Sequence, residues 1–435
     1  MHHTKSYLRK TLLTVSATAC LLGCTGTPMP VEELLSEPTA ETPARDAAVT
    51  FGSNPGGPRT GVLTAGDIDD ALNFAAFQRY AKKAAVKTGF SKTKLRRPIR
   101  AQLRGVFKPM PGVPFSLYKP GATEPFFSGQ SGVNGHITVF PSALGVNVGS
   151  TVDLKVFADH PVNTASQGFQ HSPSSQLSSR NLTWKIRPGA AREQLTVDHR
   201  PYDPDFLDLV FVIDATGSMA DELEWLTKDL NRLISRIRKE ANGIDIRLGL
   251  VVYRDHGDEF VVRNYGFTKD RSQIRRQLRK QEAVGGGDYP EAADAALAAA
   301  IDLRWRRGNG ERLVFHIADA PAQAQNASAY LAAAKTAAQR NVQVFGIGAS
   351  GVGSEAEYLM RQAALMTGGR YVFLTDDSGV GHSHAEPSIA CYRVTRLTNL
   401  IGRILASEVT GIRQEASPRE ILRRVGTYRE GRCIT

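Results

Sequence analysis

One apolar strand that ends in oxygen-bearing side chains constrains this chain more than any other feature. The five apolar residues from Leu209 to Ile213 predict a strand that is buried on both faces. Asp214, Thr216 and Ser218 follow this strand at alternate positions. Their side chains therefore project from the carboxyl end of a central strand, where open α/β sheets place their ligands.

These three side chains have two alternative roles. Hard oxygen donors without cysteine or histidine suit Mg²⁺, Ca²⁺ or Mn²⁺ better than zinc or copper. Asp, Thr and Ser are also common helix caps, and Asp221 and Glu222 are typical of a helix start. The run alone does not decide between a metal site and a cap.

Two more loops rich in oxygen donors follow later in the chain. Gly285-Gly-Gly-Asp288-Tyr-Pro-Glu291 precedes an alanine-rich helix, and the apolar run from Leu313 ends at Asp319. In this order, the three loops resemble those of the von Willebrand factor type A domain. The metal-ion-dependent adhesion site of that family combines D-x-[ST]-x-S with a threonine in the second loop and an aspartate in the third.

This resemblance implies a metal site and an α/β fold over residues 205–410. Asp214, Thr216 and Ser218 would be ligands from the first loop, and Asp319 would be the acid of the third. Asp288 stands where the family has its threonine, as in a bacterial and protist subgroup that reads GGGDxPE. In the family, a carboxylate from a partner protein completes the metal shell. The additional carboxylate of Asp288 should raise cation affinity and weaken the attraction of that partner.

The alternation of strands and helices between these loops favours the same fold class. We expect a doubly wound, mostly parallel sheet of about six strands with helices on both faces. Leu223, Leu226 and Leu230 recur at helical spacing in the segment after the first loop. The segment Phe260–Val262 is expected to form an antiparallel edge strand.

A catalytic role is not expected. His256 could pair with Asp255 or Asp258 as base and orienting acid, but a solvated hairpin loop is the favoured interpretation. The chain contains no serine or cysteine nucleophile in a recognisable triad context. We therefore predict that the protein is not an enzyme, with an envelope hydrolase as the least favoured alternative.

Two further motifs have ordinary explanations. Gly346-Ile-Gly-Ala-Ser-Gly351 fits the GxGxxG pattern, but it comes late in the domain and Tyr371 stands where a dinucleotide site needs an acid. His382 and His384 could contribute to a zinc site, yet no cysteine or third histidine is near in the sequence. A tight strand exit and a polar loop are the favoured interpretations.

The amino-terminal segment predicts an exported lipoprotein. Lysine and arginine precede the apolar stretch from Thr11 to Leu22, so residues 1–23 are interpreted as a signal peptide. Leu21-Leu-Gly-Cys24 resembles a bacterial lipobox, which implies cleavage before Cys24 and acylation of that residue. Thr25 follows it instead of aspartate, which in a Gram-negative cell favours the outer membrane. We expect a lipid-anchored protein of the cell envelope, on its periplasmic or surface face.

The rest of the chain divides by composition. Residues 24–62 lack an apolar period and predict a flexible tether. Residues 63–97 predict an amphipathic helix, from Asp67 to Tyr80, and a basic linker. Residues 98–190 alternate like short strands with turn signals, which predicts a small β-sandwich similar to carboxypeptidase-regulatory or prealbumin-like modules. Residues 411–435 are expected to form a basic tail.

Cysteine usage predicts one disulfide. Loss of Cys20 with the signal peptide and acylation of Cys24 leave Cys391 and Cys433. In an oxidising envelope these two residues are expected to pair, and the closed loop would stabilise the fold by about 4 kcal/mol in the chain-entropy model. Two unpaired thiols are the alternative.

The positive charge allows several partners. The formal net charge is +11, and it falls to +8 without the cations of the signal peptide. Export makes nucleic acid an unexpected partner, whereas anionic lipid or another anionic envelope polymer remains open, as does a solvated basic face. The leading hypothesis is an envelope lipoprotein that binds a divalent cation and, through it or beside it, a partner protein. The competing hypothesis is a structural lipoprotein whose ion only stabilises the fold or is absent.

Overall fold

The computed structural model describes residues 63–161, 177–240, 243–287, 289–349, 351–378, 386–387 and 389–434. These residues form an α/β domain and a smaller β domain. Within these ranges no helix has the length and apolar character that a membrane span requires. The residues predicted to form the signal peptide and the tether, including Cys24, lie outside the described residues.

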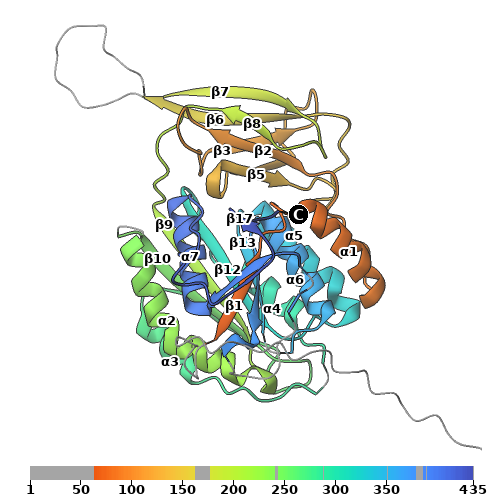
Figure 1. Cartoon of the computed structure of the whole chain (residues 1–435), viewed down its shortest axis with the longest axis vertical. Coiled ribbons are helices and arrows are strands. Elements are labelled where there is room, and N and C mark those ends of the chain that lie inside the picture. The colour runs from red at the N-terminus through yellow and green to blue at the C-terminus, as the bar shows by residue number, and fades with distance from the viewer. Residues whose placement is uncertain are drawn as a thin grey trace, which may run out of the picture. The chain divides into compact units, whose positions relative to one another are not determined.

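Within the described residues, nine strands form the central sheet of the α/β domain (Figure 1). Strands β10, β9, β12, β13 and β14 run parallel, and the other pairings in the sheet are antiparallel. The sheet is larger than the six or so strands expected, because β1 and β16 join it from outside residues 205–410 and seven strands lie within that range. Its order is β11 (Val262–Thr268), β10 (Asp245–Tyr253), β9 (Phe206–Asp214), β12 (Gly310–Ala318), β13 (Gln343–Gly348), β14 (Tyr371–Thr375), β1 (Thr64–Ile68), β15 (Tyr392–Arg396) and β16 (Arg423–Val425).

Helices cover both faces of this sheet, which confirms the doubly wound α/β class (Figure 1). Alternate residues of the fully buried strand β9 enter two separate cores, with Phe211 in the first and Val212 in the second. The first core also contains side chains of α2 (Ala220–Glu240), α3 (Arg271–Arg279) and α7 (Leu397–Thr410). The second contains side chains of α4 (Ala293–Ile301), α5 (Ala327–Gln339) and α6 (Ser354–Thr367).

The segment predicted as a helix from Asp67 to Tyr80 begins instead as strand β1. Helix α1 (Phe74–Thr88) starts only after it. Strand β1 pairs with β14 on one side and with β15 on the other, and all five of its residues are buried. Asp67 and Asp70 do not serve as helix-start acids, because they form ion pairs with Arg370 and Arg361 of the α/β domain. Tertiary pairing therefore overrides the local helix signal.

Two small sheets make up the β domain between residues 99 and 196. They pack around a common apolar core that includes Leu103, Phe115 and Leu154. Asn134 and Gly135 form a turn in which both residues have positive φ values, of 58° and 69°. One sheet contains β5 (His136–Val139), β2 (Ile99–Arg104) and β8 (Glu193–Thr196); the other contains β4 (Phe127–Gln130), β3 (Pro114–Tyr118), β6 (Val152–Pro161) and β7 (Leu177–Ile186).

The segment predicted as a basic tail from residue 411 is folded as far as Ile434. It supplies β16 to the central sheet and a short hairpin of β17 (Tyr428–Arg429) and β18 (Arg432–Cys433). Cys391 and Cys433 form a disulfide, with their Cα atoms 5.3 Å apart. Arg413, whose side chain is only 7% exposed, donates to the carboxylates of Asp69 and Glu415. Part of the predicted basic tail is therefore neutralised inside the fold.

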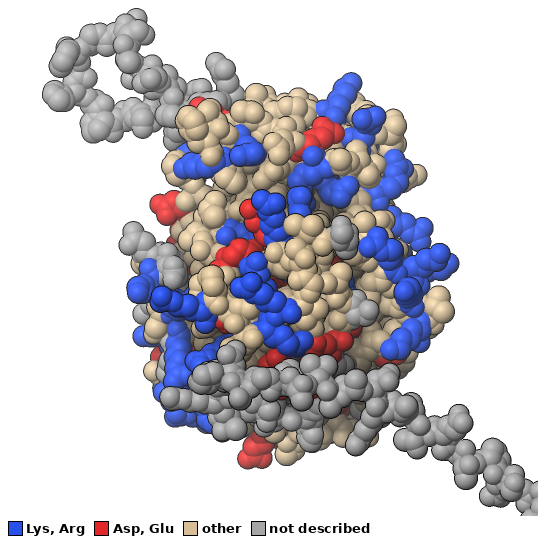
Figure 2. All heavy atoms as spheres, viewed as in Figure 1, with Lys and Arg blue, Asp and Glu red and all other residues tan. Residues whose placement is uncertain are grey.

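The surface retains much of the remaining positive charge. Lys82, Lys83 and Lys87 are exposed on α1, as are Arg96 and Arg97 of the linker that follows. Figure 2 shows Lys and Arg side chains over much of the visible face, with fewer Asp and Glu side chains between them. The predicted basic linker is therefore solvated in this structure.

Candidate functional site

The first loop of the site leaves the carboxyl end of β9. Asp214, the last residue of this strand, is fully buried. Its Oδ1 accepts hydrogen bonds from the backbone N–H of Thr216 at 3.0 Å and from the Thr216 hydroxyl at 2.7 Å. Its Oδ2 is buried without a hydrogen-bond partner among the described residues. One carboxylate oxygen therefore orders the loop, and the other is left for a ligand.

The third loop lies beside the first because β12 is the parallel neighbour of β9. Ile317 pairs with Ile213, so Asp319 follows its strand near the point where Asp214 ends β9. Asp319 is 7% exposed, and its Oδ1 is also buried without a partner in the described part of the chain. The hydroxyl of Ser218 donates to the Asp319 carboxylate and lies 3.5 Å from the Thr216 hydroxyl. Hydroxyls from loop one thus lie between the two carboxylates.

Backbone hydrogen bonds join the second loop to its neighbours. Val284 N–H donates to Ala215 O at 3.1 Å, and Gly217 N–H donates to Gly285 O at 3.2 Å, which connects loops one and two. Glu291 N–H donates to Pro321 O at 2.9 Å and connects loops two and three. All three loops therefore have fixed positions at one edge of the sheet. Asp288, the predicted second-loop ligand, lies outside the described residues.

Burial and mutual repulsion disfavour negative charge at this edge of the sheet. Burial, and then the charge of Asp319, raise the pKa of Asp214 to about 7, although hydrogen bonds from Thr216 and Tyr253 favour its charged form. Burial raises the pKa of Asp319 as well, against the hydrogen bond from Ser218. An added positive charge would stabilise both carboxylates in their ionised form.

Comparison with known proteins identifies the domain that contains these loops. Residues 208–379 match a family model described as von Willebrand factor A domain. A von Willebrand factor A domain is present in this chain. The type A domain thus includes the first, second and third loops and the parallel strands that carry them.

Curated relatives and a solved structure are similar to part of the chain. Alpha-protein kinase vwkA of Dictyostelium discoideum is 31% identical over 119 residues, which are 26% of this chain and 18% of the relative. Hemicentin-2 of Mus musculus is 32% identical over 95 residues, which are 22% of this chain and 2% of the relative. The chain therefore spans less than a fifth of either relative. The crystal structure of conserved hypothetical protein BatB from Bacteroides thetaiotaomicron covers 41% of this chain and 91% of its own, with 19% identity and a TM-score of 0.30.

Glu291 is a candidate residue of the type A domain that the sequence does not single out. Its side chain is 4% exposed, and its Oε2 has no hydrogen-bond partner among the described residues. Burial, and then the charge of Asp214, raise its pKa to about 9. A Cβ atom added to Gly286 would lie 2.7 Å from Glu291 Oε1 and 3.1 Å from Thr216 Cβ, so Glu291 lies close to the first loop. In the sequence it is the last residue of the GGGDxPE pattern, to which no ligand role was assigned.

The carboxylates alone do not make a complete metal site. Among the described residues, no group of three or more His, Cys, Asp or Glu side chains is arranged to hold a metal ion. The ligand set expected for a type A domain contains two hydroxyls, from Thr216 and Ser218, and Asp288 lies outside the described residues. Only Asp214 and Asp319 of the predicted carboxylates can be placed, and the structure brings them together with both hydroxyls.

Asp258 of the neighbouring loop Tyr253–Glu259 binds backbone N–H groups and not the histidine. Asp258 accepts hydrogen bonds from the N–H groups of Asp255 at 3.1 Å and Gly286 at 3.0 Å. Within the described ranges no hydrogen bond or ion pair joins the exposed His256 to either aspartate. The interpretation as a structural loop therefore fits the contacts better than a catalytic pair.

The glycines of the Gly346–Gly351 motif permit close packing. A Cβ atom on Gly346 would lie 2.7 Å from the Cβ of Met360 in α6, and one on Gly348 would clash with the Tyr371 hydroxyl. These contacts explain both glycines without a dinucleotide. His382 and His384 lie outside the described residues.

Proposed function

We propose that the type A domain binds a divalent cation and uses it to recognise a partner protein. Mg²⁺ is the expected ion, with Ca²⁺ or Mn²⁺ as alternatives, because all predicted donors are oxygen atoms. Asp214, Thr216, Ser218 and Asp319 would hold it, together with Asp288. The proposed role is binding and adhesion, without catalysis.

The observation that carries this proposal is a pair of unsatisfied carboxylate oxygens. Asp214 Oδ2 and Asp319 Oδ1 are both buried and both lack a hydrogen-bond partner in the described part of the chain. Buried carboxylates normally have partners, because an unpaired one loses the solvation that water gives it. Two such atoms at the ends of adjacent strands fit a site built for a cation.

A bound divalent cation would supply charge that offsets these carboxylates and a coordination position open to an outside oxygen. The chain's own residues orient that position. The N–H and hydroxyl of Thr216 fix Asp214, and Ser218 fixes Asp319. Glu291, if ionised by the added positive charge, increases the negative charge of the site further. We therefore propose tight cation binding and a modest attraction for the partner's carboxylate.

Calorimetry of the full chain in detergent tests the metal. Excess Mg²⁺ or Ca²⁺ should raise the melting temperature of the domain relative to EDTA, and 100-fold saturation corresponds to about 2.7 kcal/mol. Asp214→Asn should abolish this difference. Asp302→Asn, which changes an exposed carboxylate in the same domain, should retain it. Identical melting of the unmodified protein in Mg²⁺, Ca²⁺ and EDTA would refute the proposal.

Capture of partners from envelope extracts tests the interaction. A protein captured in Mg²⁺ and released by EDTA, and not captured by Asp214→Asn, would support ion-dependent adhesion. Stabilisation by the cation with capture that EDTA leaves unchanged would instead support the structural role, in which the β domain carries the interactions. A hydrolase screen of the same preparation tests the assignment of a non-enzymatic function.

We further propose that the protein acts as a lipoprotein of the cell envelope. The support is the lipobox-like sequence that ends at Cys24. Two or three acyl chains on this residue would give a stable anchor, whereas one chain binds only marginally. Cys24→Ser should move the protein from the membrane fraction to the soluble fraction and abolish labelling with radioactive palmitate. Unchanged fractionation with no label on the unmodified protein would contradict the anchor.

A further inference from the structure

A cavity of about 160 Å³ lies between the β domain and the amino ends of the central strands. Gly310, Glu311 and Arg312 line it at the start of β12, whereas the proposed metal site follows the other end of this strand. A nine-residue strand spans roughly 30 Å, so the cavity and the metal site are separate. The volume corresponds to about ten water molecules, or a small organic molecule.

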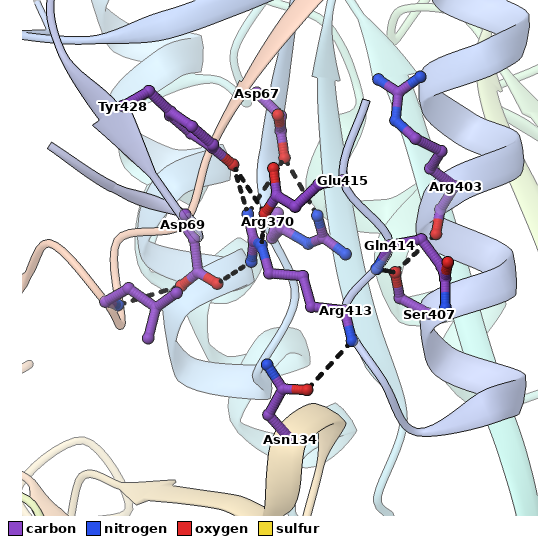
Figure 3. A network of polar contacts seen from close by, with 12 residues as sticks. Asp67, Asp69, Asn134, Arg370, Arg403, Ser407, Arg413, Gln414, Glu415 and Tyr428 are labelled. Carbon is purple, nitrogen blue, oxygen red and sulfur yellow. Dashed lines mark hydrogen bonds and ion pairs between the residues drawn. The ribbon is translucent and has the colours of Figure 1, made fainter. Parts of the chain in front are cut away.

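One wall of the cavity belongs to a network of hydrogen bonds and ion pairs around Arg413 and Arg370 (Figure 3). Arg413 donates to Asp69 at 2.7 Å and to Glu415 at 2.8 Å. Its backbone N–H donates to Asn134 Oδ1 of the β domain at 3.1 Å. Arg370 donates to Asp67 at 3.2 Å, and Figure 3 shows these groups converging from several elements. The side chains of this wall are therefore held in place, and their arginines already pair with carboxylates.

The other acids that line the cavity also have donors. Glu311 accepts a hydrogen bond from the Tyr202 hydroxyl. Glu408 lies 3.9 Å from the guanidinium of Arg370. A third lining cation, Arg312, donates to backbone carbonyl oxygens rather than to an acid. No lining carboxylate is thus left without a donor.

Arg192, immediately before β8, is the unmatched group. It lines the cavity, yet it forms no hydrogen bond or ion pair with another described residue, and its Nε is buried. His136 lies beside it and is neutral, because burial and then the charge of Arg192 lower its pKa to about 3. A neutral imidazole can donate one N–H. The charge of Asp69 favours the charged form of Arg192, but no carboxylate of the described residues forms an ion pair with it. A partly buried guanidinium without such a pair is costly, so its presence in a cavity indicates a site for an anion.

One side of the cavity is apolar, beside polar lining residues such as Gln130, Thr138 and Gln343. Phe115, Phe127, Ile137 and Val139 of the β domain face the cavity, as does Met366 of α6. A site with one cationic end and an aromatic side fits a ligand with an acidic head and an apolar body. We propose that this cavity binds a small organic anion, with its carboxylate or phosphate on Arg192 and its apolar part against Phe115 and Phe127.

Thermal shift of the full chain tests the proposal with four probes: acetate, benzoate, inorganic phosphate and phenyl phosphate. Benzoate or phenyl phosphate should give a saturable rise in melting temperature, and the probe that binds better identifies the head group. The rise should be unchanged in EDTA, which separates this site from the metal site. Arg192→Gln should weaken binding at least about tenfold, as expected for loss of a charge-assisted pair. Arg187→Gln, which removes an exposed arginine of the same domain, should bind like the unmodified protein.

Arg192→Gln also distinguishes a ligand-binding role of Arg192 from a purely structural one. Without probe, Arg192→Gln should melt at the same temperature as the unmodified protein or above it, because an unpaired charge has been removed. If that variant melts lower, Arg192→Lys provides a second measurement, since it keeps the charge and should bind more weakly than the unmodified protein. The proposal is overturned if no probe gives a saturable shift, or if Arg192→Gln and Arg187→Gln respond alike.

Discussion

Asp208 joins three segments at the amino end of the central sheet, and its removal should be costly. The carboxylate lies in β9 and has no exposed surface. It accepts from Arg247 Nε at 2.9 Å, from Arg306 Nε at 2.8 Å and from the Arg306 backbone N–H at 2.9 Å. Burial alone would raise the pKa of Asp208, but these hydrogen bonds outweigh it and hold the pKa below its usual value.

We expect Asp208→Asn to reduce the free energy of unfolding by about 3 kcal/mol. Breaking a buried ion pair by removing one partner typically costs about 3–5 kcal/mol. Two features favour the lower end of this range. The side chains of Arg247 and Arg306 are 22% and 21% exposed, so water solvates them in part, and Arg306 keeps Asp245 as a partner at 2.8 Å. Urea unfolding followed by tryptophan fluorescence measures the loss.

A surface pair provides the control. Asp302, 74% exposed, pairs with Arg340 at 3.1 Å, and Asp302→Asn should cost less than about 1 kcal/mol. The stabilisation by Asp208 should be constant above its ordinary pKa of 3.8 and should be lost as the pH falls through its lower folded value. Equal losses for the two variants, or a difference between them that vanishes already at pH 6, would refute the reasoning.

Two further predictions concern the disulfide and a buried histidine. Replacing Cys391 or Cys433 by serine should cost up to about 4 kcal/mol in urea unfolding, and the double variant should lose no more than either single one; additive losses would argue against the bond. His316 lies between the hydroxyls of Tyr253 at 3.0 Å and Tyr330 at 2.9 Å, and burial lowers its pKa to about 3. The contribution of His316 to the free energy of unfolding should be complete above pH 6.5. Below that pH it should decline by up to about 1.4 kcal/mol per pH unit. His316→Phe should therefore show a flatter stability profile between pH 6.5 and 4.5, and parallel profiles would contradict the assignment.

Local patterns predicted the parallel part of the fold because each strand there is a continuous apolar run. The centre of the sheet, which is covered on both faces, contains Leu209 to Ile213 and the run from Leu313. Their apolar character is what a strand buried on both faces requires. The same patterns predicted where the candidate metal-site residues lie. Strands that run in parallel place their following loops at one edge, which brings Asp214 and Asp319 together.

The remaining features depend on contacts between distant segments, which have no local signature. Strand β1 is a short Thr-Ala-Gly-Asp-Ile segment that is extended only because β14 and β15 pair with it. The acids near it predict a helix start, although their actual partners are arginines about 300 residues away. Glu291 is similar, since its burial against the first loop is a property of the assembled site.

Strand β1 lies inside the sheet, and this position predicts that the type A domain does not fold well from residues 205–410 alone. Such a fragment leaves β14 and β15 without the strand between them. It also leaves Arg361, 1% exposed, without Asp70, and Arg370 without Asp67. Removing one partner of a buried ion pair costs about 3–5 kcal/mol, so the loss of two such partners is comparable to the whole stability of a typical domain.

We therefore expect the fragment 205–410 to show no cooperative unfolding transition by circular dichroism, whereas residues 63–434 should show one. The full-chain variant Asp70→Asn isolates one contribution and should lose about 3–5 kcal/mol, because Arg361 would keep only Glu357 at 2.8 Å. A peptide of residues 63–90 added to the fragment should restore part of the lost structure. A fragment that unfolds cooperatively with the stability of the longer chain would show that β1 and its acids are an accessory to the domain and not part of its core.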